Sequence, residues 1–508
     1  VVQRLVDHSL VRVVAPERVE LLSLVREYGR RRLMELGEAE RAERRHGEWY
    51  ARYGLEGSLS RLDGADGPSA AAELDDALPN LLAACQRAVT RGDAAVAGPT
   101  ARAYWRVMLR CGSAEAGARL LEAALAVPGH DDSARTVLSM DAGWARRLAS
   151  DYDRSAAHYD AAAALAESAG DRRALGRILR AQGDAARLRR RPAVARPLYE
   201  RALEAARAVE DTGGEAVAVA ALGVVALEES RLDDARRLLF DALELHRGRG
   251  NRRSEAVTLG NLGLVAATAC DFAEATSLLT EAHELHRSFG NVGSAAHAQL
   301  NLALVDLARG RLDAVAPRLD EAERTFVLRG DPYLAAEVRT ARGELLLARR
   351  EYSAAQRAYE AGLAGYRASG NPIGCAFALT GLGLVRAARG DRVGGRQRMV
   401  EALDLVEPTH DLRTLGIIAT LLAELDLDAD GPAHAEPMLD RAERCLASRG
   451  DPLWVAIARC VRSRAARMAG DLARAEAERD AAEAVARRLD LTPESELRRR
   501  LDALARGA

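Results

Sequence analysis

The densest group of side chains able to recognise a ligand is a set of arginines at helical spacing, Arg177, Arg180 and Arg187. A planar guanidinium presents a fork of N–H donors that fits a carboxylate or a phosphate. An acidic peptide or a phosphorylated small ligand would suit this group, with Trp144 as an aromatic neighbour. The competing interpretation is an arginine-rich helix face exposed to solvent. DNA binding is less favoured, because neither a groove-reading helix nor interleaved aromatic residues accompany the arginines.

Catalytic and metal-binding motifs are missing from the sequence. The chain contains no lysine, so it cannot carry the phosphate-binding loop GxxxxGK[ST]. It also lacks HExxH, GxSxG and any CxxC pair among its 6 cysteines. His246 and His286 are one repeat apart, but Phe326, Tyr366 and Val406 take the same place at the following steps, which is typical of a packing position. We therefore expect no enzyme, no metal site and no cofactor in this chain.

Length, composition and charge favour a multidomain or solenoid protein and argue against a basic nucleic-acid-binding one. The chain has 508 residues, more than one hydrophobic core organises, so several domains or a solenoid are expected. Hydrophobic residues make up 48% and aromatic residues only 4%, so alanine must do much of the packing. With 73 basic and 75 acidic residues the net charge is -2, which gives no overall basic field for nucleic acid.

The sequence also predicts a location. It contains no long apolar run and does not start like a signal peptide, and its cysteines are scattered. We therefore expect a cytoplasmic protein that does not bind membranes. Because the chain begins with Val1, we expect it to be part of a longer protein.

One stretch, residues 250–291, defines the unit from which most of the chain is built. Leu262 and Val265 share one face of a predicted first helix. A second helix begins near Phe272 and carries apolar residues at the i, i+3, i+4, i+7 spacing of an amphipathic helix. Gly290 follows the last apolar turn, where a glycine usually ends a helix.

This unit repeats every 40 residues without drift. The turn after the second helix recurs at Gly170, Gly250, Gly290, Gly330, Gly370 and Gly450. A small residue of the first helix recurs at Gly143, Gly183, Gly223, Gly263, Ala303, Gly343, Gly383, Ala423 and Ser463. One of the second helix recurs at Ala162, Ala202, Ala242, Ala282, Ala322, Gly362, Ala402, Ala442 and Ala482. Three series in one register indicate a helical solenoid.

The unit resembles the tetratricopeptide repeat. Leu262-Gly263 in the first helix, with Ala275 and Ala282 in the second, carry the resemblance, which covers roughly residues 92–490. It implies about ten helix pairs in a right-handed superhelix whose first helices line the concave face. The unit is longer than the usual repeat of that family, which has about 34 residues. The early Trp and closing Pro of that family are mostly absent, so its peptide-binding residues do not transfer by position.

The N-terminal segment, 1–55, differs from the repeats. We predict the end of a helix in the first ten residues, strands over residues 10–14 and 18–22, and a long helix over 23–36. A helix followed by a two-stranded wing is the order found at the end of a winged-helix fold. This stretch resembles the end of the nucleotide-binding module of bacterial signal-transduction ATPases of the NB-ARC type, and residues 78–125 also fit that family. The resemblance implies a transcriptional regulator in which ATP is bound only by a module upstream of this chain.

The expected fold class is all-α: a tetratricopeptide-like right-handed α-solenoid with a small N-terminal winged-helix remnant. The expected domains are 1–55, a winged-helix tail and linker helix; 56–91, a helical connector; 92–490, the repeats; and 491–508, a C-terminal capping helix. In the last of these, Thr492 is the predicted N-cap and Pro493 the first helical residue. We expect that helix to be polar on most faces, as suits a terminal cap.

Recurring positions of the first helices are expected to line the concave face and to bind the ligand. The candidate binding residues are Tyr104, Met140, Trp144, Arg147, Arg177, Arg180, Arg187, His297, Glu337 and Glu344. The expected occupant is a protein or peptide partner, or a small-molecule inducer.

We interpret the chain as a ligand- or protein-binding sensor of a cytoplasmic bacterial transcriptional regulator. Binding on the concave face would be coupled to an upstream ATPase and effector module. The alternative is a free-standing tetratricopeptide adaptor that assembles protein partners. Neither interpretation gives this segment direct contact with nucleic acid.

Overall fold

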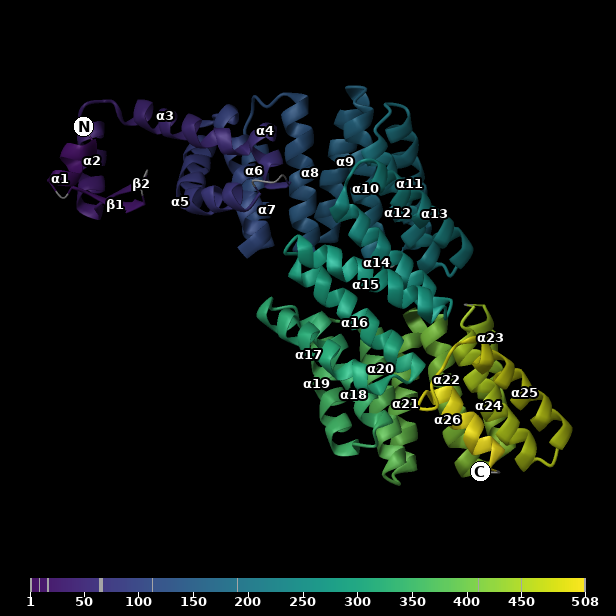
Figure 1. Cartoon of the computed structure of the whole chain (residues 1–508). Coiled ribbons are helices and arrows are strands. Elements are labelled where there is room, and N and C mark those ends of the chain that lie inside the picture. The colour runs from purple at the N-terminus through teal and green to yellow at the C-terminus, as the bar shows by residue number, and fades with distance from the viewer. Residues whose placement is uncertain are drawn as a thin grey trace. The chain divides into compact units, whose positions relative to one another are not determined.

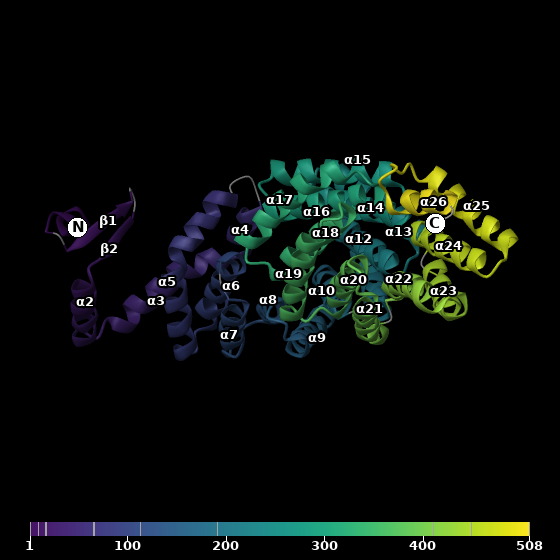
Figure 2. The same cartoon turned by 90° about the horizontal axis from the view of Figure 1, so that it is seen from below.

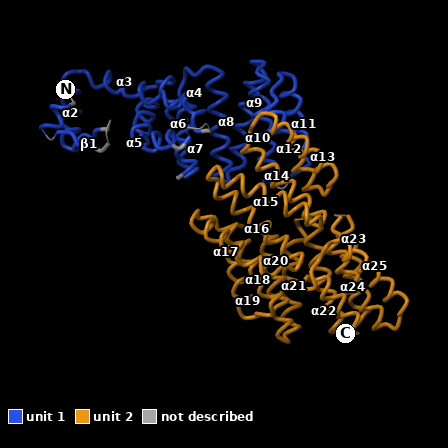
Figure 3. Tube along the Cα trace, viewed as in Figure 1, with its two compact units in different colours: residues 1–218 blue, residues 219–508 orange. Residues whose placement is uncertain are grey.

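The computed structural model describes residues 2–8, 10–15, 18–63, 67–111, 113–189, 191–409, 411–448 and 450–506 (Figure 1). Within these residues α-helices provide nearly all of the regular structure, and the strands form one hairpin. The chain divides into two compact units, residues 1–218 and 219–508 (Figure 3). Among the described helices, none is both long enough and apolar enough to cross a membrane.

The first unit opens with a helix and a hairpin. Its first elements are α1 (Val2–Asp7), β1 (Val11–Ala15), β2 (Arg18–Leu21) and α2 (Ser23–Glu35). The two strands are antiparallel, and Val13 pairs with Val19. No residue of α2 is buried. The two strands and the helix that follows them lie where the sequence predicts them.

Helix pairs fill the rest of the first unit. They are preceded by α3 (Ala39–Ala51), η1 (Arg52–Gly54), α4 (Glu56–Leu59) and η2 (Ser60–Asp63). The paired helices are α5 (Gly67–Arg91), α6 (Ala94–Cys111), α7 (Ala114–Leu125), α8 (Asp132–Leu148), α9 (Tyr152–Ser168), α10 (Arg172–Leu188) and α11 (Pro192–Arg207). Helix α12 (Thr212–Glu228) continues from this unit into the second.

The second unit continues the same alternation of first and second helices. Its helices are α13 (Leu232–Gly248), α14 (Arg252–Thr268), α15 (Phe272–Ser288), α16 (Val292–Arg309), α17 (Leu312–Leu328), α18 (Pro332–Ala348), α19 (Tyr352–Ala368), α20 (Pro372–Ala388) and α21 (Arg392–Val406). They are followed by η3 (Glu407–Thr409), α22 (Leu412–Asp430), α23 (Pro432–Ala447), α24 (Pro452–Met468), α25 (Leu472–Arg488) and α26 (Glu496–Ala505). The even-numbered helices from α14 to α24 are the first helices of their pairs.

Short turns with a fixed residue pattern separate the helices. Before α14, Gly250 adopts a φ of 65°, and the Asn251 side chain accepts a hydrogen bond from the Ser254 backbone N–H at 3.1 Å. Before α15, Asp271 accepts in the same way from the Glu274 N–H at 3.1 Å. Glycine adopts this left-handed φ at no steric cost, and Asn or Asp satisfies a free N–H of the first helical turn. The recurring Gly-Asn and Gly-Asp pairs are therefore a turn followed by a cap.

Within each pair the two helices approach closely at the small residue of the first helix. A Cβ atom at Gly263 would lie 2.7 Å from Cγ of Leu279, so the α14 backbone packs directly on that side chain of α15. Leu279 is fully buried by this contact. The same arrangement joins Gly143 to Tyr159, Gly183 to Tyr199, Gly223 to Leu239 and Gly343 to Tyr359.

The first helices form the inner layer of the second unit. Helices α14, α16, α18, α20, α22 and α24 contact one another in succession, whereas no comparable contact joins the described second helices of this unit, α13 to α25. A stack of helix pairs curves toward the side on which its successive helices lie closest. We call the exposed side of these first helices the inner face.

The C-terminal segment of the second unit reaches back to much earlier repeats. The Thr492 backbone N–H donates to the Arg309 carbonyl oxygen at 2.9 Å. The buried guanidinium of Arg309 also donates to the Asp490 carboxylate at 2.5 Å. Leu489 packs in one apolar cluster with Phe272 and Leu302. These contacts hold the C-terminal segment against α15 and α16 of the same unit.

The last helix differs from the prediction in two respects. Helix α26 begins at Glu496, not at Pro493, and its N-cap is Ser495, which accepts from the Arg498 N–H at 3.4 Å. The predicted cap, Thr492, is instead held by the contact with Arg309. The helix is also amphipathic rather than polar on most faces, because packing on α24 and α25 requires an apolar side (Figure 2). Its buried leucines are Leu497, Leu501 and Leu504.

The close approach of paired helices is testable at two glycines of α14. Gly263→Ala places a methyl group against Leu279 and should destabilise the protein by about 1–3 kcal/mol, the usual cost of overpacking a core. Gly260 is the matched control, since a Cβ there meets no atom within 4 Å. Gly260→Ala should stabilise the protein by about 0.5–1 kcal/mol through helix propensity. Urea unfolding measures both changes, and equal effects at the two sites would refute the close approach.

Candidate functional site

Two of the predicted aromatic candidates of the first unit pack inside it. Tyr104 is buried among the apolar residues of α5 and α6, rather than exposed on a binding face. Trp144 is half-buried and meets Trp105 edge-on, with ring centroids 5.8 Å apart. The Arg106 guanidinium lies 5.4 Å from the Trp144 ring centroid. Met140 is also half-buried, beside the core of α9 and α10.

The predicted arginine group mostly serves internal contacts. Arg180 donates to Asp184 at 2.7 Å, and the Tyr199 hydroxyl donates to the same carboxylate at 2.8 Å. Arg187 hydrogen-bonds to Tyr199 as well. Burial, together with Asp184, raises the pKa of Tyr199 well above its usual value. Arg177 alone of the group stays exposed without an ion pair among the described residues, so the structure favours the solvated helix over a dedicated anion site.

Arg147, another predicted binding residue, takes part in an arginine–tyrosine contact that recurs one repeat later. Arg147 hydrogen-bonds to the buried Tyr159, as Arg187 does to Tyr199 one repeat later. In both cases the tyrosine is the large residue that packs on the glycine of the first helix. The spacing of one repeat between the two pairs was visible in the sequence, but only the packing shows that these arginines face a phenol.

The second unit holds the remaining candidates. His297 of α16 and Glu344 of α18 are exposed, and Glu337 of α18 is half-buried. In repeat register, His297, Glu337 and Phe377 occupy one position on three successive first helices. These helices contact one another, so the three side chains form one row of the inner face.

A second row of the inner face runs through Glu344. Leu304 of α16 and Leu384 of α20 occupy the same repeat position as Glu344 and are only partly buried. The carboxylate is therefore flanked by two aliphatic side chains. Although Glu344 remains accessible, the surrounding concave protein removes part of its hydration.

The two glutamates share an unusual electrostatic environment. Loss of hydration raises the pKa of Glu337 to about 7, and the nearby Asp331 adds to the effect. The pKa of Glu344 is also raised to about 7 by loss of hydration, partly offset by Arg413. Within the described residues, neither carboxylate has an ion pair or hydrogen bond. By contrast, Glu323 on α17 accepts hydrogen bonds from two arginines, at 2.9 Å and 3.0 Å.

Aromatic rings lie beside these carboxylates. Tyr333 and Tyr366 meet edge-on with centroids 6.2 Å apart, and Tyr333 is 41% exposed. Tyr366 is buried, and its pKa is raised by burial first and by the charge of Glu337 second. The charge of Glu344 raises the pKa of Tyr366 as well, to a smaller extent than that of Glu337.

The C-terminal helix already covers one end of the inner face. Arg500 of α26 donates to both carboxylate oxygens of Glu424, at 2.7 Å and 2.9 Å. Arg499 donates to the Ala348 carbonyl oxygen at the end of α18, at 3.1 Å. The part of the inner face that stays open therefore runs over α16, α18 and α20.

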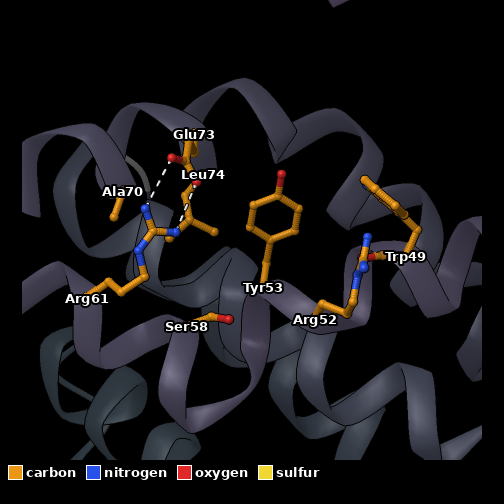
Figure 4. A pocket seen from close by; sticks show the side chains of 8 residues that line it. All are labelled: Trp49, Arg52, Tyr53, Ser58, Arg61, Ala70, Glu73 and Leu74. Atoms are coloured by element: carbon orange, nitrogen blue, oxygen red, sulfur yellow. Dashed lines mark hydrogen bonds and ion pairs between the residues drawn. The ribbon is translucent and has the colours of Figure 1, made fainter. Parts of the chain in front are cut away.

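Metal ligands, the two repeat-spaced histidines and a cavity in the first unit complete the survey of candidate sites. Among the described residues, no group of three His, Cys, Asp or Glu side chains is placed to hold a metal ion. His246 and His286 are buried, as the packing interpretation predicts. A cavity of about 170 Å³ in the first unit escaped sequence reasoning: in Figure 4, Tyr53 lies between the Arg61–Glu73 ion pair and Trp49.

Solved structures share this architecture at low sequence identity. A signal-transduction ATPase with numerous domains (STAND) that carries a tetratricopeptide repeat sensor, from Pyrococcus horikoshii, gives a TM-score of 0.53 at 13% identity, covering 80% of this chain and 58% of that chain. A Rap protein complexed with competence and sporulation factor gives 0.50 at 13% identity, covering 61% and 87%. The apo quorum sensor NprR from B. thuringiensis gives 0.50 at 12% identity, covering 70% and 99%.

These similarities establish the fold. The chain is a tetratricopeptide-like right-handed α-solenoid, as the repeat pattern predicts. No protein-family model matches the chain, and no curated protein sequence matches it.

The raised pKa of Glu344 predicts a pH-dependent effect on stability. Its ordinary pKa of 4.5 applies to the unfolded chain, and about 7 to the folded one, so the folded state loses stability as pH rises from 4.5 to 7. Glu344→Gln should therefore raise the Tm more at pH 8 than at pH 5. Differential scanning calorimetry at both pH values measures this, with Glu284→Gln on the outer helix α15 as the control. A larger gain at pH 5 would contradict the assignment.

Proposed function

We propose that this chain is the ligand-binding sensor region of a cytoplasmic bacterial transcriptional regulator. A peptide or protein segment is the ligand we favour, bound on the open inner face over α16, α18 and α20. The observation that carries the proposal is the pair of carboxylates on this face, Glu337 and Glu344, which have no ion pair among the described residues and whose pKa is raised to about 7 by loss of hydration.

The architecture supports a sensor. The Rap structure contains competence and sporulation factor, NprR is a quorum sensor, and the STAND protein carries a tetratricopeptide repeat sensor. The helix and hairpin at the start of this chain fit the winged-helix end of an NB-ARC module. The module that binds ATP and the effector that acts on DNA then belong to the upstream part of such a regulator.

The mechanism follows from contacts between first helices. A ligand that spans α16, α18 and α20 touches three successive repeats at once, so its affinity depends on their spacing. Binding shifts the curvature of the stack only if the ligand prefers one curvature over another. The contact of Asp490 and Thr492 with Arg309 links the C-terminal segment to α16, so a change in the curvature of the repeats between them must strain that contact. We assign no catalytic role to the chain.

The proposal is tested by locating bound peptide on the solenoid. Binders selected from a random hexapeptide library on the immobilised chain should protect backbone amides of α16, α18 and α20 in hydrogen–deuterium exchange. Protection confined to second helices such as α17 and α19 would support an adaptor instead. An absence of any saturable binder would refute peptide sensing.

A further inference from the structure

The inner face offers unpaired carboxylates at a defined spacing. Glu337 and Glu344 are seven residues apart on α18, which is about two helical turns, or roughly 10 Å along the axis. Arg413, the cation that acts on the pKa of Glu344, already donates to Asp451 at 2.8 Å. Both carboxylates therefore stand without a counter-charge of their own.

The chain itself shows which group this face accepts. Glu424 occupies the same repeat position as Glu344, two repeats later. There the guanidinium of Arg500 binds both carboxylate oxygens, at 2.7 Å and 2.9 Å. A bidentate arginine contact of this kind is among the stronger charge-assisted hydrogen bonds. Glu344 presents the equivalent carboxylate with the place of the arginine unfilled by any described residue.

The apolar side chains around Glu344 and Glu337 indicate what should lie beside the cationic group of the ligand. Leu304 and Leu384 flank the carboxylate in its row, and Phe377 flanks Glu337 in the other. The exposed edge of Tyr333 lies on the same helix, α18. Such a site suits a ligand that carries a cationic group beside apolar groups. The cation can pair with the carboxylate while the apolar groups of the ligand are buried against the aliphatic and aromatic side chains.

We propose that the inner face of α18 binds a peptide through a cationic group, an arginine side chain or a free amino group, paired with Glu344 and Glu337 between apolar side chains. This inference rests on the proposed function and names the chemical class of its ligand. The occupant is a short cationic peptide, not a phosphorylated or acidic one. The arginines predicted to bind anions, Arg180 and Arg187, are occupied by Asp184 and Tyr199.

Binding should release protons near neutral pH. A cation favours the ionised carboxylates, whose pKa values lie at about 7 in the free protein. The groups that face them are Arg413, Asp331, His297, Tyr359 and Tyr366. Burial lowers the pKa of His297 and raises the pKa of both tyrosines, which favours the neutral form of all three. Ionisation of one such site falls roughly tenfold between pH 8 and pH 6. We therefore expect the affinity for a cationic peptide to be at least about tenfold weaker at pH 6.

Pools of acetylated hexapeptides provide the test. One pool carries arginine at its third position, and the matched pool carries citrulline, which has the same shape without the charge. Fluorescence anisotropy should show at least roughly tenfold tighter binding of the arginine pool, as expected for one charged pair. Glu344→Gln and Glu337→Gln should each remove most of that preference, whereas Glu284→Gln on α15 should leave it intact. A non-acetylated citrulline pool that binds as well as the arginine pool would identify a free amine as the cation.

The outcomes separate this inference from the proposed function. If acetylated arginine and citrulline pools bind equally and still protect α16, α18 and α20 from exchange, the cationic class is wrong and the peptide sensor stands. If Glu344→Gln and Glu337→Gln bind the arginine pool as the wild type does, the assigned carboxylates are wrong. If no pool binds, both proposals fail. The melting temperature of each variant distinguishes lost binding from lost folding.

Discussion

The close packing of each first helix on a large side chain of the second determines the rest of this structure. A glycine such as Gly263 or Gly343 removes the Cβ that would otherwise hold the helices apart, and Leu279 or Tyr359 fills the space against bare backbone. Dense contact of this kind contributes dispersion energy along the whole pair. It also explains how a chain with 4% aromatic residues builds a continuous core, since small residues let each large side chain contact many atoms.

Contact between the first helices of successive pairs makes the stack curve, and the curvature creates the inner face. Because successive first helices contact one another directly, their remaining exposed positions converge on the concave side. The C-terminal segment contacts α16 through Arg309, Asp490 and Thr492 and so links repeats that are far apart along the stack. Helix α26 covers the inner face over Glu424 and leaves the neighbouring helices open. The result is an open surface of limited extent over α16, α18 and α20.

Polar groups of the first helices have different surroundings at two places in the chain. In the first unit Arg147 and Arg187 face buried tyrosines, and these contacts stabilise the pairs. In the second unit Glu337 and Glu344 are left without partners, which costs stability at neutral pH because their charged forms are poorly hydrated. Uncompensated charge on a face that is otherwise well packed is typical of a binding surface.

The sequence by itself determined the helices, the turns between them and the register of the repeat, because caps, glycines and apolar spacing act within a few residues of one another. It also placed His297, Glu337 and Glu344 on accessible first helices. It could not separate these from Tyr104, Arg180 or Arg187, which occupy related repeat positions but are buried or already paired. It misplaced the cap of α26 as well, since Thr492 is held by Arg309, which lies several repeats earlier in the sequence. Such contacts depend on the curvature of the assembled stack, and only the tertiary structure sets that curvature.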